Sequence, residues 1–78
     1  MIKLKNIELH GDVIRVYVES FMTAQKECYS LEFNYKTGEF KASIQEVDLF
    51  DIAKIKHKLT SYLDEGKELP KKACIAYF

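Results

Sequence analysis

A chain of 78 residues is expected to form one domain (residues 1–78), with room for a single thin hydrophobic core but not for a deep, enclosed pocket. Hydrophobic residues make up 47% of the chain, and five tyrosines and five phenylalanines are among them, so the composition excludes intrinsic disorder. Twelve basic residues balance twelve acidic ones, which weighs against nucleic-acid binding, since phosphate binding depends on a basic surface.

The sequence lacks the long apolar segments that direct a chain to membranes. No apolar run approaches the ~20 residues that cross a bilayer. Residues 1–12 alternate lysine with apolar residues, whereas a signal peptide has a continuous apolar block. Two cysteines are too few for a disulfide framework and are expected to be free thiols. We therefore expect a cytoplasmic protein without membrane contact.

The first predicted strand covers residues 2–10, and its alternation slips in the middle. Hydrophobic residues occupy even positions before the slip and odd positions after it: Ile2 and Leu4, then Ile7 and Leu9. A β-bulge at residues 5–6 would bring all four to one face of the sheet. In the alternative, Ile2 and Leu4 face the opposite side.

Three further strands follow in hairpin order. Gly11-Asp12 and Thr37-Gly38 predict tight turns, and residues 22–25 predict a loop. The strands are expected over residues 13–21, 27–35 and 40–47. Folding at these turns sets hydrophobic residues opposite one another in the pairs Leu9–Ile14, Val18–Tyr29, Leu31–Ile44, Phe33–Ala42 and Tyr35–Phe40. The pattern predicts a four-stranded antiparallel meander with one hydrophobic face.

The segment 47–66 predicts one amphipathic helix that covers this face. Asp48 is a suitable N-cap, and Asp51 follows at the third helical position, near the positive end of the helix dipole. Gly66 and Pro70 end the helix. Its hydrophobic residues recur at spacings of three and four: Leu49, Ile52, Ala53, Ile55, Leu59, Tyr62 and Leu63.

The last segment, residues 69–78, is rich in strand-forming residues. If the helix crosses back over the sheet, this segment begins near the first hairpin turn and can run antiparallel beside the first strand. The expected fold is therefore α+β, with the strand order tail-1-2-3-4 and the element order ββββαβ. The alternative is that Ile75, Tyr77 and Phe78 pack against another chain.

The histidines and cysteines, which often serve in catalysis, stand apart from one another. His10 precedes a Gly-Asp turn, and two potential ligands do not make a metal site. Neither Cys28 nor Cys74 has a predicted base beside it that would lower the pKa of the thiol. Glycine-rich phosphate loops and nucleophile motifs are absent from the sequence, and no family resemblance emerges. We therefore expect no catalytic residue, no metal site and no cofactor, and a protein that is not an enzyme.

Aromatic residues expected at the surface point to a protein-binding module. Phe50 should project about a third of a turn away from the main hydrophobic face of the helix, and His57 follows it at heptad spacing. Tyr77 and Phe78 are the last two residues. Clustered surface aromatics are typical of protein interfaces. The preferred function is a small non-catalytic regulator, adaptor or inhibitor that occupies the surface of a partner protein, and a homodimer is a related hypothesis.

The alternative function is weak binding of single-stranded nucleic acid. Arg15, Tyr17, Phe21 and Lys41 are expected on the sheet face that the helix leaves open, and sheets with basic and aromatic residues can stack exposed bases. Carboxylates expected on the same face, such as Glu19 and Glu32, would repel phosphate.

Overall fold

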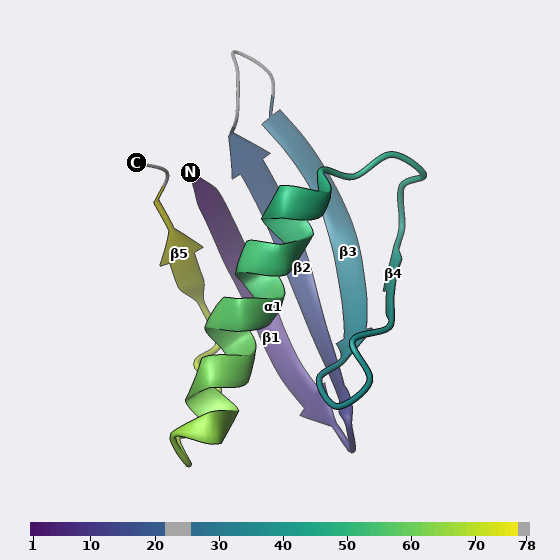
Figure 1. Ribbon diagram of the computed structural model, residues 1–78. Coiled ribbons are helices and arrows are strands. Elements are labelled where there is room, and N and C mark those ends of the chain that lie inside the picture. Colours follow the sequence, from purple (N-terminus) through teal and green to yellow (C-terminus); the bar gives the residue numbers. More distant parts are fainter. Residues whose placement is uncertain (22–25, 77–78) are drawn as a thin grey trace.

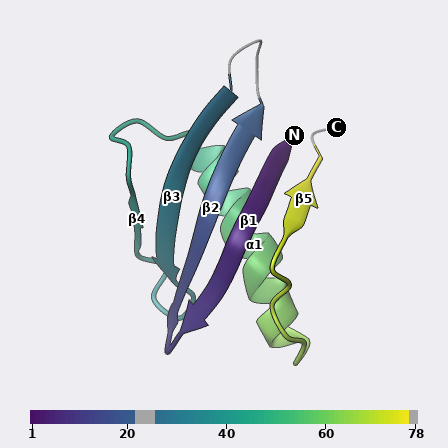
Figure 2. The ribbon, with the colours of Figure 1, turned by 180° about the vertical axis from the view of Figure 1, so that it is seen from behind.

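The computed structural model describes residues 1–21 and 26–76 (Figure 1). In chain order the elements are β1 (Ile2–His10), β2 (Val13–Phe21), β3 (Lys26–Asn34), β4 (Phe40–Ala42), α1 (Leu49–Asp64) and β5 (Ala73–Ile75). The strands form one antiparallel sheet in the order β4-β3-β2-β1-β5. α1 lies across one face of the sheet, and the other face, here called the outer face, is open in the reverse view (Figure 2). The predicted α+β fold is confirmed.

A bulge in β1 places its hydrophobic residues on the side of α1. The pairing of β1 with β2 shifts between Lys5 and Glu8, and Asn6 has a positive φ of 51°. Ile2 and Leu4 are fully buried and Ile7 is nearly so. The predicted bulge is therefore confirmed, and the alternative with Ile2 and Leu4 on the opposite side is wrong.

The positive φ of Asn6 in the bulge leads to a prediction about stability. Asparagine tolerates a positive φ better than most residues, and glycine adopts it without steric cost. We expect Asn6→Gly to leave the free energy of unfolding unchanged or raise it slightly. Asn6→Val should lower it by about 1–2 kcal/mol, because a β-branched side chain clashes in this conformation. Urea unfolding of both variants measures the difference, and equal stabilities would contradict this view of the bulge.

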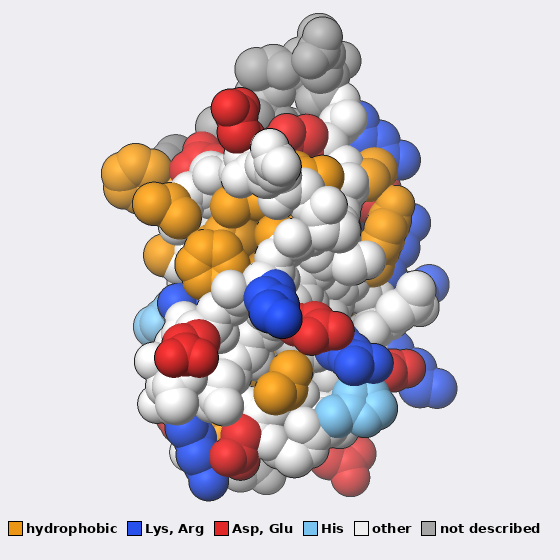
Figure 3. Space-filling model, turned by 90° about the vertical axis from the view of Figure 1, so that its right-hand side faces the viewer, with side chains coloured by type: hydrophobic (Ala, Val, Ile, Leu, Met, Phe, Trp, Pro, Cys, Tyr) orange, Lys and Arg blue, Asp and Glu red, His pale blue; other side chains and the backbone are white. Residues whose placement is uncertain are grey.

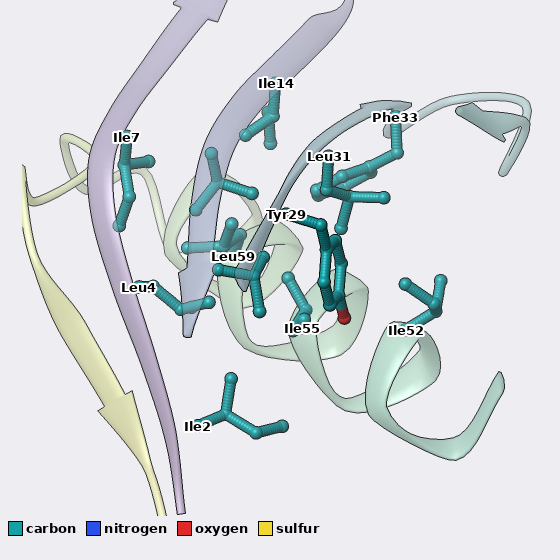
Figure 4. Close-up of a cluster of buried hydrophobic side chains, with 12 residues drawn as sticks. Ile2, Leu4, Ile7, Ile14, Tyr29, Leu31, Phe33, Ile52, Ile55 and Leu59 are labelled. Atoms are coloured by element: carbon teal, nitrogen blue, oxygen red, sulfur yellow. The ribbon is translucent and has the colours of Figure 1, made fainter. Parts of the chain in front are cut away.

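The core lies between the sheet and α1 (Figure 4). On the helix, Ile52, Ile55 and Leu59 recur at spacings of three and four and are at most 2% exposed. They face buried residues of the first three strands: Ile2, Leu4, Ile7, Ile14, Val16, Val18, Tyr29, Leu31 and Phe33. A single layer of side chains thus joins the helix to the sheet, as expected for a chain of this length.

The buried stripe of α1 is narrower than the sequence pattern predicts. Leu49 is 67% exposed and Ala53 is also exposed, although both were expected on the hydrophobic face. A helix turns by about 100° per residue, so Leu49 lies roughly 90° from the centre of the buried stripe and Ala53 lies farther still. The sheet covers only the central part of the hydrophobic arc.

The pairing of β4 with β3 is shifted by two residues from the predicted register. Phe33 lies opposite Phe40, not Ala42, and Leu31 lies opposite Ala42. The cause is the turn, which spans residues 35–38. The Asn34 side chain accepts hydrogen bonds from the backbone N–H groups of residues 36 and 37, at 2.9 and 3.1 Å. Because side chains alternate with period two, a shift of two keeps every residue on its predicted face.

β4 is much shorter than the predicted strand over residues 40–47. The predicted fifth strand is confirmed, because β5 lies within the segment 69–78. β5 runs antiparallel to β1, with Ile75 opposite Ile2. The hypothesis that Ile75 packs against another chain is therefore wrong. Tyr77 and Phe78, like the predicted loop at 22–25, lie outside the described residues.

Candidate binding surfaces

The beginning of α1 exposes two adjacent large hydrophobic side chains. Leu49 is 67% exposed and Phe50 is 80% exposed, the highest values among the large hydrophobic residues that the structure describes. Ile44 and Val47, in the segment that leads into the helix, are only half-buried. Hydrophobic side chains gather in the upper left of the face shown in Figure 3, on the side of the molecule that carries the helix. Exposed apolar groups gathered in this way are typical of association sites.

Two aspartates fix the first turn that carries these side chains. The Asp48 carboxylate accepts a hydrogen bond from the backbone N–H of Phe50 at 2.8 Å, which confirms the predicted N-cap. Asp51 is only 3% exposed, and its carboxylate accepts a hydrogen bond from the Ser20 hydroxyl at 3.0 Å. The sequence placed Asp51 near the helix dipole but did not predict this contact with β2. The first turn of α1 is therefore capped by Asp48 and linked to the sheet by Asp51.

Four exposed residues form one stripe along α1: Leu49, Phe50, Ala53 and His57, here called the helix stripe. At 100° per residue these positions span an arc of about 100° on the side away from the sheet. His57 follows Phe50 by two turns, as predicted. The other two residues of the predicted protein-binding set, Tyr77 and Phe78, lie outside the described residues.

The outer face carries the residues of the nucleic-acid alternative, but carboxylates accompany them. Arg15 donates to Glu32 at 3.0 Å, and Lys41 lies opposite the same Glu32 in the strand pairing. Tyr17 and Phe21 also lie on β2, at the same alternating positions as Arg15. The four predicted residues therefore share a face, but Glu32 lies between the two basic ones.

Two lysines that are not in the predicted nucleic-acid set lie beside Phe21. The Lys3 and Lys26 ammonium groups lie 5.6 and 5.8 Å from the centre of its ring, within the range of cation–π interactions. Lys26 is the cross-strand partner of Phe21, so the hairpin register could have identified it. Lys3 lies on β1, opposite Glu19 of β2, and its side chain extends from there to the Phe21 ring.

Glu19 occupies a charged cluster beneath these side chains. Its carboxylate lies 2.6 Å from the Lys5 ammonium and 3.2 Å from the Lys26 ammonium, and its side chain is only 8% exposed. The hydrogen bond from Lys5, followed by that from Lys26, holds the pKa of Glu19 below its ordinary range. In return, the hydrogen bond and charge of Glu19 raise the pKa of Lys5.

This pairing predicts a pH-dependent contribution to stability. A carboxylate whose pKa is lower in the folded state stabilises the fold above its unfolded pKa, about 4.3, and that contribution disappears as the pH falls through the folded pKa. We expect Glu19→Gln to lower the free energy of unfolding at pH 7. The gap should narrow as the pH falls below about 4.3 and close below the folded pKa of Glu19, where both proteins lack the charge. Urea unfolding across this range measures the gap, and a gap that does not change with pH would contradict the prediction.

The remaining cysteines and histidines of the described residues lie apart from one another. A hydrogen bond with the Cys28 thiol raises the pKa of the Tyr17 hydroxyl. Cys28 and Cys74 are free and exposed, and His10 contacts Glu8 at 2.9 Å. Within residues 1–21 and 26–76, His, Cys, Asp and Glu nowhere form a group of three or more that could hold a metal ion. The one helix in the same residues is too short and too polar to span a membrane.

Comparison of the chain with protein-family models, with curated proteins and with solved structures finds no match. The candidate surfaces are therefore defined by their own geometry: the helix stripe on one side of the molecule and, on the outer face, Phe21 and Glu19 with Lys3, Lys5 and Lys26 around them. The first is largely apolar and the second is largely basic.

Proposed function

We propose that this chain is a small, non-catalytic protein-binding module of the cytoplasm, a regulator, adaptor or inhibitor that presents the helix stripe to a partner protein. The observation that carries the proposal is the exposure of Leu49 and Phe50, 67% and 80%, at a helix start that is fixed in place. Burying two such side chains against a partner would contribute roughly 3–5 kcal/mol of hydrophobic free energy, before the costs of association are subtracted.

The spacing of the helix stripe supports a particular mode of binding. Phe50, Ala53 and His57 occupy positions i, i+3 and i+7, which is how an amphipathic helix presents one face to a groove. The hydrogen bonds of Asp48 and Asp51 order this turn in the free chain, so binding loses little conformational entropy there. The expected partner is a protein with an apolar groove that accepts Phe50. Polar groups at the edge of this groove would lie beside His57.

A capture experiment with paired variants tests the proposal. The immobilised chain is incubated with lysate of its native cell, one half treated with nuclease and the other untreated. We expect a stoichiometric protein partner that survives nuclease and is lost with the double variant Leu49→Ser/Phe50→Ser. Leu9→Ser is the matched control, because Leu9 is also exposed, at 44%, but lies at the distant end of β1. It should retain the partner.

Light scattering of the same proteins covers the case in which the partner is a second copy. A dimer that dissociates in Leu49→Ser/Phe50→Ser but persists in Leu9→Ser would make the helix stripe a homodimer interface. If both variants retain the partner, or the dimer, equally well, the helix stripe is not the binding surface. A monomeric chain that captures nothing would contradict the proposed function itself.

A further inference from the structure

Lysines gather on the part of the outer face where β1 lies between β2 and β5. Lys3, Lys5 and Lys26 lie around one carboxylate, Glu19, and Lys72 lines a surface pocket with Lys3 and Lys5. These four lysines and Phe21 are called the basic surface here. Glu19 already lies against Lys5 and Lys26. Within the described part of the chain, Lys3 and Lys72 make no ion pair. A chain with no net charge thus has a local excess of positive charge at this site.

The strand pairing brings like charges together. Lys3 lies opposite Cys74 and Leu4 opposite Ala73, and Lys72, the residue before β5, lines the same pocket as Lys5. Lys3, Lys5 and Lys72 line a surface pocket of about 250 Å³ together with Leu4, Ala73 and Cys74. Like charges that face each other across a sheet are unfavourable. An anionic ligand in this pocket would relieve that repulsion.

An aromatic ring adjoins the lysines. Phe21 is half-buried, and the ammonium groups of Lys3 and Lys26 lie 5.6 and 5.8 Å from the centre of its ring. Tyr17, four residues before it on β2, is 36% exposed. Basic groups that alternate with aromatic rings on a sheet suit a ligand with both phosphates and unpaired bases. An acidic peptide would use the lysines but has no particular need of the rings.

We infer that the basic surface binds single-stranded nucleic acid. Lys3, Lys5 and Lys72 contact phosphates, and Phe21 stacks on a base once the lysine ammonium groups turn from the ring to the backbone. The site differs from the predicted set, because Arg15 and Lys41 lie farther along the outer face, around Glu32. It also lies on the opposite side of the sheet from the helix stripe, so the two surfaces can be tested independently.

Fluorescence anisotropy of a labelled oligothymidine of about 15 nucleotides tests this inference. Neutralising about three phosphates predicts an affinity that falls about 20-fold between about 50 and 200 mM salt. The double variant Lys3→Glu/Lys72→Glu should weaken binding by more than tenfold, and Phe21→Ala by about tenfold. Glu19→Gln should tighten binding, because it removes the one carboxylate of the site. Leu49→Ser/Phe50→Ser should leave binding unchanged.

The matched control is Arg15→Glu/Lys41→Glu, which changes the net charge by the same amount on the same face. Circular dichroism confirms that each variant folds. Equal weakening by the two double variants would overturn the inference, because attraction by overall charge would then account for binding. Equal affinity for polyglutamate of the same length, or for duplex DNA, would also overturn it, as would the absence of binding at about 50 mM salt.

Discussion

Replacing Phe33 by alanine is expected to lower the free energy of unfolding by about 4 kcal/mol, because the side chain is lost from a core only one layer thick. Phe33 is 1% exposed, near the end of the third strand, and belongs to the buried cluster that also contains Ile52, Ile55 and Leu59 of the helix. A domain of this length has a total stability of roughly 4–12 kcal/mol. The variant should therefore lose between a third and nearly all of the total stability, and its urea midpoint should shift strongly to lower concentration.

Phe40→Ala is the matched control for this prediction. Phe40 lies directly opposite Phe33 in the strand pairing but is 38% exposed, and the Lys56 ammonium lies 5.6 Å from the centre of its ring. The same substitution should cost only about 1 kcal/mol there. If both variants lose the same stability, the core does not lie where the structure places it.

Replacing Asp51 is expected to have the second large effect on the free energy of unfolding. Its buried carboxylate accepts from the Ser20 hydroxyl at 3.0 Å, and a hydrogen bond to a charged group contributes more than a neutral one. We expect Asp51→Ala to lower the free energy of unfolding by about 2 kcal/mol, since the Ser20 hydroxyl is then left in the core. Asp51→Asn keeps an acceptor in place and should lose less.

A double-mutant cycle with Ser20→Ala measures the coupling directly. The double variant should lose about 1–2 kcal/mol less than the sum of the two single variants. Asp64→Ala is the control, because Asp64 is exposed at the other end of α1. It should leave stability almost unchanged or raise it slightly, since a carboxylate there opposes the helix dipole. Additive losses in the cycle would contradict a direct link between the helix and the second strand.

Local patterns were sufficient to predict the order of elements. The slip in alternation at residues 5–6 required a bulge if one face was to be hydrophobic, and Asn6 adopts the positive φ that such a bulge uses. The turn residues and the alternation fixed the pairing of the second strand with the third, which matches the predicted register throughout. The fourth strand was misplaced by two residues, because the bonding capacity of the Asn34 side chain was overlooked.

The candidate surfaces were only partly predictable. Helical periodicity identified Phe50 and His57 as outward-facing, but placed Leu49 inside, because periodicity does not show how wide a strip the sheet covers. The nucleic-acid set from sequence included Arg15 and Lys41 and missed Lys3 and Lys72. These two lysines are about 70 residues apart in the chain and reach one pocket only because β5 pairs with β1.

The sequence by itself determined the order of the elements and, from the second strand on, the side of the sheet to which the strand residues point. These properties depend on periodicity and turn chemistry, which act over a few residues. Only the tertiary structure decided that Asp51 is buried against Ser20, that Glu19 lies between Lys5 and Lys26, and that the start of α1 remains exposed. Each of these depends on distances between strands and helix, which follow from how the whole core packs and not from any local pattern.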